Sequence, residues 1–136
     1  MPGRFFDTNV LIYLVSSDAG KANRAETLLT EGGTISVQVL NEIANVARRK
    51  MRLSWEETHA LLTSVRGFLV VRPLTLEIHE TGLEISQRHG LSTYDAMIVA
   101  SALDAGCDTL WSEDMHHGMV FEGRLRIVNP FRGPTP

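Results

Sequence analysis

The sequence has almost no cysteine and no long hydrophobic run. Its single cysteine, Cys107, cannot form an internal disulfide and cannot build a cysteine-based zinc site alone. The longest apolar stretches, such as residues 10–15 and 96–100, are far shorter than the ~20 residues that span a bilayer. Asp7 interrupts the first apolar stretch and no small-residue cleavage site follows, so we expect no signal peptide. These absences favour a cytoplasmic protein without disulfides or a membrane span.

An excess of positive charge is also missing. The chain has 13 Lys and Arg against 16 Asp and Glu, a formal net charge of −3. This balance argues against a protein that mainly coats nucleic acid, but it allows an acidic site within a locally basic surface. Hydrophobic residues make up 43% of the 136 residues, which is enough for one domain with a real core. We expect that domain at residues 1–130 and a flexible tail at 131–136.

Short apolar strands alternate with helices along the chain. After a first strand at residues 5–6, which turns into a helix at Asp7, the pattern predicts strands at 34–36, 69–72, 109–112 and 126–128. Helices are expected at 21–30, 37–50, 54–66, 75–89 and 92–105. Strands that are apolar throughout and alternate with helices indicate an α/β fold, in which helices flank both faces of a mostly parallel sheet.

Acidic residues recur where strands end or helices begin. Asp7 follows the first strand within RFFDTNVLIYL, and Asp114 follows the strand that ends TLWS. Glu42 lies near the start of the helix after TIS, and Asp95 lies in the first turn of the helix that Ser92 opens. In parallel sheets the carboxyl ends of the strands meet at one edge, where ligands bind. We therefore expect these four carboxylates to converge.

Converging carboxylates need a counter-charge. Two unit charges ~4 Å apart repel by about 4 kcal/mol at an effective dielectric constant of 20. A divalent cation would offset this repulsion, and oxygen ligands without thiolates favour Mg²⁺ or Mn²⁺ over zinc. Mg²⁺ in such sites commonly takes phosphate oxygens from the substrate, so the expected substrate is a phosphate ester.

Each carboxylate taken alone also has a structural explanation. Ser92 and Asp95 fit a helix capping box, Glu42 fits the border of a solvated helix face, and Asp114 fits a turn or helix cap. Asp7 is the hardest to explain in this way, because it lies between apolar residues that should be buried. The prediction of a metal site therefore depends on the four residues together.

Four segments resemble the PIN-domain family, in particular its VapC-type toxins of prokaryotic toxin–antitoxin pairs. They are FFDTNVLIYL, SVQVLNEIANV, LSTYDAMIVASALDAGCDTLWSEDMHHG and LRIVNPF, in the family's order and over nearly the whole chain. The resemblance implies a three-layer PIN-like α/β sandwich and an Mg²⁺- or Mn²⁺-dependent endoribonuclease that leaves 5′-phosphate and 3′-hydroxyl ends. It also implies a VapB-type antitoxin as partner and a homodimer.

The resemblance also implies roles for individual residues. The catalytic and metal-binding residues would be Asp7, Glu42, Asp95 and Asp114, and the polar residues that support them by hydrogen bonds would be Asn9 and Ser112. Glu113 competes with Asp114 for the last position, and the family's Ser/Thr-x-Asp pattern selects Asp114.

One basic segment stands out, RRKMR at residues 48–52. Its cations, which are candidate contacts for RNA phosphates or for an acidic part of an antitoxin, are Arg48, Arg49, Lys50 and Arg52. A helix C-terminus that favours cations through its dipole explains the same residues. Candidates for dimer or antitoxin contacts, explained equally well by core packing, are Leu28, Leu29, Trp55, Leu61 and Leu62.

Two other functions compete with the ribonuclease. A haloacid-dehalogenase-like phosphatase also places an Asp after an apolar strand, but it needs a second Asp two residues later, where this chain has Asn9. A non-catalytic PIN-like module for RNA binding or interaction would be favoured by the loss of an acidic position, and all four are present. The sequence therefore predicts a ribonuclease.

Overall fold

A six-stranded sheet forms the centre of the structure, a computed structural model that describes residues 3–132. The strands are β1 (Arg4–Phe6), β2 (Gly33–Ser36), β3 (Leu69–Arg72), β4 (Thr109–Trp111), β5 (Val120–Phe121) and β6 (Leu125–Val128). Their order is β3-β2-β1-β4-β6-β5, and every neighbouring pair is parallel except β5 and β6. The predicted mostly parallel sheet is confirmed.

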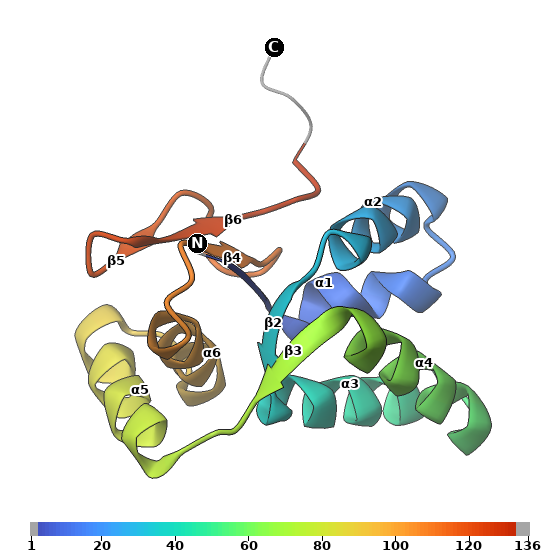
Figure 1. Ribbon diagram of the computed structural model, residues 1–136, viewed down its shortest axis with the longest axis horizontal. Helices are drawn as coiled ribbons and strands as arrows, with labels where there is room; N and C mark the ends of the chain where they lie inside the picture. The colour runs from blue at the N-terminus through green and yellow to red at the C-terminus, as the bar shows by residue number, and fades with distance from the viewer. Residues whose placement is uncertain (1–2, 133–136) are drawn as a thin grey trace.

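Helices cover both faces of this sheet. They are α1 (Thr8–Ile12), the 3₁₀ turn η1 (Tyr13–Val15), α2 (Ala19–Thr30), α3 (Val37–Arg49), α4 (Trp55–Phe68), α5 (Leu76–His89) and α6 (Thr93–Asp104). Figure 1 shows α5 and α6 on one side of the sheet and α1 to α4 on the other. The three-layer α/β sandwich predicted from the sequence is therefore correct.

Local signals in the sequence explain where several helices begin and end. A capping box opens α4, since the Ser54 side chain accepts from the Glu57 backbone N–H and the Glu57 side chain accepts from the Ser54 backbone N–H. Gly90 ends α5 with a φ of 71°, a left-handed conformation that glycine adopts without steric cost. Helix α6 is buried over most of its length, as its apolar sequence predicts.

The core lies between the sheet and its two helical layers. The strands contribute fully buried side chains, among them Phe5, Phe6, Ile35, Leu110 and Ile127. Leu28, Leu29 and Leu61, which the sequence left open as core or interface residues, are buried, whereas Trp55 is exposed.

Among residues 3–132, no helix is both long and apolar enough to cross a membrane. Of the tail expected at 131–136, residues 133–136 lie outside the described range, and Phe131 packs its ring edge-on against Tyr13.

Gly33 of β2 packs tightly against β1 and gives a stability prediction. Its φ is +152°, and a Cβ there would lie 2.8 Å from the Arg4 carbonyl oxygen and 2.8 Å from the Phe6 ring. Gly33→Ala should therefore lower the free energy of unfolding by about 2–3 kcal/mol, because the backbone of β1 must shift. The measurement is urea denaturation.

Gly67→Ala is the matched control for Gly33→Ala. Gly67 lies in α4, and a Cβ added there would point into open space, with no neighbouring side chain within 4 Å. Alanine there should leave stability unchanged or raise it by up to about 1 kcal/mol, because alanine has the higher helix propensity. Equal losses in the two variants would contradict the close approach of β2 to β1.

Candidate active site

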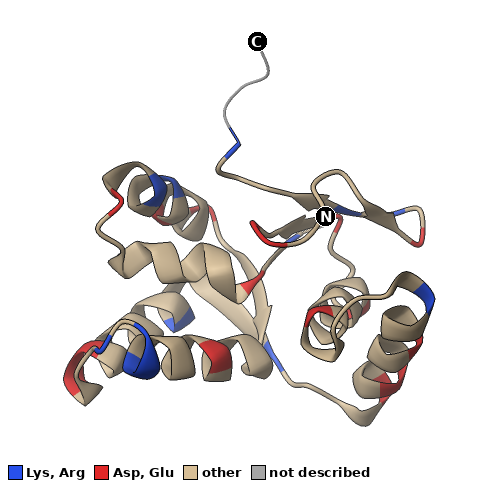
Figure 2. Ribbon diagram, turned by 180° about the vertical axis from the view of Figure 1, so that it is seen from behind, with Lys and Arg blue, Asp and Glu red and all other residues tan. Residues whose placement is uncertain are grey.

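A cavity of about 440 Å³ opens at the carboxyl ends of the parallel strands. All four carboxylates singled out in the sequence line it: Asp7, Glu42, Asp95 and Asp114. Figure 2 shows acidic segments at the end of β1, in α3, near the start of α6 and after β4, arranged around one region of the molecule. The topology thus brings together four side chains that are far apart in the sequence.

Asp7 is the most buried of the four, with 4% of its surface exposed. Its Oδ1 accepts from the Thr8 backbone N–H at 2.7 Å, and its Oδ2 accepts from Asn9 Nδ2 at 3.0 Å and Ser112 Oγ at 2.8 Å. Burial raises the pKa of Asp7 to about 7, against the hydrogen bonds from Ser112 and Thr8, and the charges of Asp95 and Glu42 add to the rise. Three donors therefore fix a carboxylate whose charge is still strongly disfavoured.

Glu42 is partly buried beside Asp7. It accepts from Thr8 Oγ1 at 3.2 Å and from Gln38 Nε2 at 2.8 Å. Burial raises the pKa of Glu42, the hydrogen bonds from Gln38 and Thr8 oppose that rise, and the charge of Asp95 adds to it. Helix α3 places this side chain because Glu42 lies next to the buried Val39 and Ile43 face of the helix.

Asp95 and Asp114 complete the acidic lining. The Asp95 backbone N–H donates to Ser92 Oγ at 3.2 Å, so the cap expected from the sequence is present while the carboxylate borders the cavity. Burial raises the pKa of Asp95, the Ser92 hydrogen bond opposes that rise, and the charge of Asp114 adds to it. Asp114 lies in the loop after β4 and is exposed. Each carboxylate is thus within electrostatic range of another.

Asn9 and Ser112 join this loop to the end of β1. Asn9 donates to Asp7 and its Oδ1 accepts from the Glu113 backbone N–H at 3.0 Å. Ser112 Oγ donates to Asp7 and accepts from the Met115 backbone N–H at 3.2 Å. Both residues predicted to support the site therefore bond directly to Asp7 and also hold the segment that carries Asp114.

Glu113, the competitor of Asp114 in the sequence, has other partners. Lys21 Nζ donates to its Oε2 at 2.6 Å, and the Tyr13 hydroxyl donates to its Oε1 at 2.6 Å. Sequence reasoning missed Lys21 and Tyr13. No local signal could have found them, because Lys21 and Glu113 are 92 positions apart and meet only through tertiary packing.

The donor set fits a hard divalent cation chemically. The described residues that line the cavity supply carboxylate oxygens and no histidine or cysteine. Within residues 3–132, no three His, Cys, Asp or Glu side chains lie close enough together to hold a metal ion by themselves. Mg²⁺ tolerates such an arrangement, because it commonly uses one or two carboxylates and keeps several waters. A cation would also offset the unfavourable charge of buried Asp7.

The basic segment at residues 48–52 is divided between two environments. Lys50 lines the acidic cavity. Arg48 instead donates to the Leu53 carbonyl at 2.7 Å and lies over the Trp55 ring at 4.3 Å. Arg49 and Arg52 are exposed. Lys50 is therefore the member of this segment that borders the site.

Comparison with solved structures finds several similar folds. VapC20 of Mycobacterium tuberculosis, described as a sarcin-ricin loop cleaving toxin, has a TM-score of 0.64 and 19% identity over 82% of this chain and 89% of that chain. A chain of a toxin–antitoxin complex from Klebsiella pneumoniae has a TM-score of 0.70 and 22% identity, covering 94% and 98%. A chain of the DNA-bound VapBC of Salmonella typhimurium has a TM-score of 0.70 and 22% identity, covering 93% and 97%.

Two comparisons of the sequence itself were made, one with curated proteins and one with family models. No curated protein sequence matches this chain significantly. The family model of the PIN domain matches residues 4–118, a range that includes all four carboxylates of the cavity. The solved structures share the same arrangement of strands and helices over most of their lengths. This chain belongs to the PIN domain family.

Proposed function

We propose that this chain is a metal-dependent endoribonuclease and the toxin of a toxin–antitoxin pair. The observation that carries the proposal is the cavity lined by Asp7, Glu42, Asp95 and Asp114 at the carboxyl edge of the sheet. Membership of the PIN domain family supports it. The names of similar structures, which include a sarcin-ricin loop cleaving toxin and toxin–antitoxin complexes, support it further. An RNA-cleaving toxin acts where its RNA is, so we place it in the cytoplasm.

The residues of the cavity would have two roles, metal binding and the orientation of a metal ligand. Asp7, Glu42, Asp95 and Asp114 would hold Mg²⁺ or Mn²⁺. When bound, such an ion lowers the pKa of a coordinated water and neutralises negative charge on the phosphoryl oxygens. Asp7 is kept in one orientation by the donors of Thr8, Asn9 and Ser112. Phosphodiester hydrolysis in this site would leave 5′-phosphate and 3′-hydroxyl ends.

The test of the proposal is direct cleavage by the purified chain. It should cut RNA in the presence of Mg²⁺ or Mn²⁺ and stop on addition of EDTA, and sequencing of the RNA ends should find 5′-phosphates at discrete positions. Cleavage that EDTA does not reduce, or no cleavage of any cellular RNA, would contradict the proposal. The same sequencing after induction of an Asp95→Asn variant should return the pattern of uninduced cells.

A non-catalytic PIN-like RNA-binding module is the second candidate function. The observation that favours it is the absence, within residues 3–132, of three acidic side chains close enough together to hold an ion unaided. Such a module would bind RNA in EDTA as tightly as in Mn²⁺ and would leave every RNA intact. The cleavage assay therefore separates the two functions.

Lys50 should contribute to RNA binding. It lies at the rim of a cavity that is otherwise acidic, where a cation can reduce the repulsion between the site and the RNA phosphates. Lys50→Gln should weaken RNA binding and lower the slope of log K against log salt by about 0.7–0.9, the value for one lost phosphate contact. The measurement is fluorescence anisotropy at several salt concentrations with the inactive Asp7→Asn background.

Arg66→Gln is the matched control for the loss of one cation. Arg66 is exposed in the last turn of α4 and does not line the acidic cavity. This variant should keep the wild-type salt slope. A Lys50→Gln slope equal to that of the control would show that Lys50 does not contact RNA.

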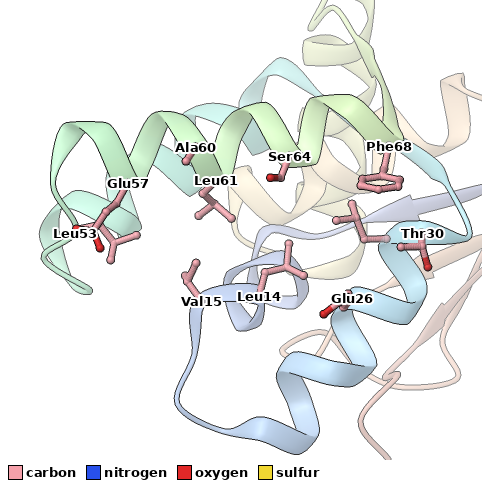
Figure 3. A pocket seen from close by; sticks show the side chains of 11 residues that line it. Leu14, Val15, Glu26, Thr30, Leu53, Glu57, Ala60, Leu61, Ser64 and Phe68 are labelled. Atoms are coloured by element: carbon pink, nitrogen blue, oxygen red, sulfur yellow. The ribbon is translucent and has the colours of Figure 1, made fainter.

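A second cavity, of about 600 Å³, is the proposed binding site for the antitoxin. Figure 3 shows Leu14 between α2 and α4, with Leu61 and Phe68 projecting from α4 above it. The charged side chains that line this groove are Glu26 and Glu57, and its described lining contains no lysine or arginine. A groove with apolar walls and acidic borders fits an amphipathic segment that carries both apolar and basic residues.

Ala60→Arg should disrupt this docking. Ala60 lines the groove, so an arginine there would occupy the space of the antitoxin and add an unfavourable charge. We expect the affinity for the antitoxin encoded beside this chain's gene to fall by about 30-fold or more, the size of a hot-spot loss. Thr63→Arg, on the same helix but outside the groove lining, should keep wild-type affinity. Calorimetric titration of the two folded variants decides between these outcomes, and equal affinities would contradict the groove assignment.

A further inference from the structure

A cluster of side chains from separate parts of the chain lies beside the acidic cavity. It joins Tyr13 of η1, Lys21 of α2, Glu113 of the loop after β4, and Phe131 near the C-terminus. Lys21 Nζ donates to Glu113 Oε2 at 2.6 Å and to the Tyr13 hydroxyl oxygen at 3.2 Å, and the Tyr13 hydroxyl donates to Glu113 Oε1 at 2.6 Å. Both carboxylate oxygens of Glu113 therefore accept hydrogen bonds, one from Tyr13 of η1 and one from Lys21 of α2.

This ion pair is more sheltered than the other two salt bridges among the described residues. The side chains of Lys21 and Glu113 are 35% and 23% exposed, against 42–47% for the side chains of the other pairs, Arg4–Glu31 and Arg72–Asp104. Lys21 Nζ also lies 4.7 Å from the Tyr13 ring centroid and 5.3 Å from that of Phe131. An ion pair between aromatic rings is less screened by water than an exposed pair and contributes more.

The cluster is linked to the acidic cavity through the backbone of the loop after β4. The Glu113 backbone N–H donates to Asn9, and Ser112 and Asn9 both donate to Asp7. Asp114, the next residue, is exposed. Asp114 directly follows Glu113 in the chain, and the side chain of Glu113 is hydrogen-bonded to Lys21 of α2 and Tyr13 of η1.

We propose that Lys21 is a positioning residue that holds Glu113, with the help of Tyr13, so that the adjacent Asp114 faces the acidic cavity. The inference rests on the proposed function, because it concerns the placement of a proposed metal ligand. It assigns Glu113 to the framework of the site. It also distinguishes Lys21 from a simple RNA-binding cation, since its charge is directed at Glu113.

The test compares Lys21→Met, Glu113→Ala and the double variant, with Arg72→Met as control. Arg72→Met removes a different, more exposed ion pair, that with Asp104, at a place that does not line the acidic cavity. The first readout is the Mn²⁺ concentration that gives half of the maximal rise in unfolding temperature. The second readout is RNA cleavage at a series of RNA concentrations, from which kcat and KM are determined separately for each variant.

Lys21→Met and Glu113→Ala should each weaken Mn²⁺ binding and lower kcat by about 10-fold or more, as is usual when a partner that orients a metal ligand is lost. KM for RNA should not change. The double variant should be no worse than the poorer single variant, because both changes break one interaction. Lys21→Arg should retain most of the activity, since a guanidinium can bond the same carboxylate. Arg72→Met should resemble the wild type.

Three results would overturn the inference. One is a higher KM with unchanged kcat in Lys21→Met alone, which would make Lys21 an RNA contact. Another is a double variant whose loss of kcat equals the product of the losses in the two single variants. The third is a Lys21→Met variant that matches Arg72→Met in both Mn²⁺ binding and RNA cleavage.

Hydrogen exchange of the metal-free protein separates this inference from the proposed function. The backbone amides of Glu113 and Met115 should exchange faster in Lys21→Met than in Arg72→Met, whether or not the wild type cleaves RNA. Unchanged exchange would overturn the inference even if cleavage is observed. If the wild type cleaves no RNA but these amides exchange faster in Lys21→Met, the proposed function fails while the role of Lys21 in ordering the loop is supported.

Discussion

Replacing Asp7 with asparagine should lower the rate of RNA cleavage by about 10²- to 10³-fold, the usual cost of losing one group that stabilises charge in a transition state. Asparagine has nearly the same shape and can still accept from the Thr8 backbone N–H, which bonds Asp7 at 2.7 Å. What it lacks is the negative charge that would face the metal ion. The measurement is the initial rate of cleavage of an end-labelled RNA at saturating Mn²⁺.

Asp104→Asn is the control for this loss. Asp104 lies at the other end of α6 from Asp95 and pairs with Arg72 on the surface. The control should cleave RNA at the wild-type rate. An Asp7→Asn variant that cleaves within a few-fold of the control would show that the buried carboxylate has no part in the reaction.

The same Asp7→Asn change should make the metal-free protein more stable at pH 8. A pKa of about 7, against the usual 3.8, means that holding Asp7 ionised in the folded state is unfavourable by about 4 kcal/mol. The variant removes that charge but places an NH₂ donor at the position of Oδ2, which can no longer accept from Asn9 and Ser112, at a cost of about 1 kcal/mol for each lost hydrogen bond. We therefore expect a net gain of about 2 kcal/mol, measured by urea denaturation in EDTA.

The pH dependence of that gain follows from the direction of the pKa shift. Because the folded protein holds the Asp7 proton more tightly than the unfolded chain, Asp7 stabilises the fold at low pH and this contribution is lost as the pH rises from about 4 to about 7. The advantage of the variant should thus be large at pH 8 and small near pH 4. A variant that is less stable than the wild type at pH 8 would contradict the account of a disfavoured charge.

Much of the fold could be predicted because its signals are local. Ser54 with Glu57 and Gly90 identify helix ends by hydrogen-bonding and backbone rules that involve only neighbouring residues. The sequence did not reveal β5, whose two residues are too few to show a period, nor η1. Strand β5 forms because Glu122 and Gly123 turn the chain back onto β6 with positive φ angles.

The site was predictable to the extent that topology alone determines it. Parallel strands bring the residues that follow them to one edge, and this rule was sufficient to place Asp7 and Asp114 on the same cavity. The pairing of Lys21 with Glu113 depends on how α2 packs beside the loop after β4, which no pattern of neighbouring residues specifies. The contact of Arg48 with Trp55 likewise depends on the turn between α3 and α4.

The most direct test of the central claim is an anomalous-scattering map from crystals of this chain grown with Mn²⁺. We predict a peak inside the cavity bounded by Asp7, Glu42, Asp95 and Asp114, and its loss in crystals of Asp7→Asn. A map with Mn²⁺ bound only elsewhere, or with the same peak in the variant, would contradict the claim that these carboxylates form a metal site.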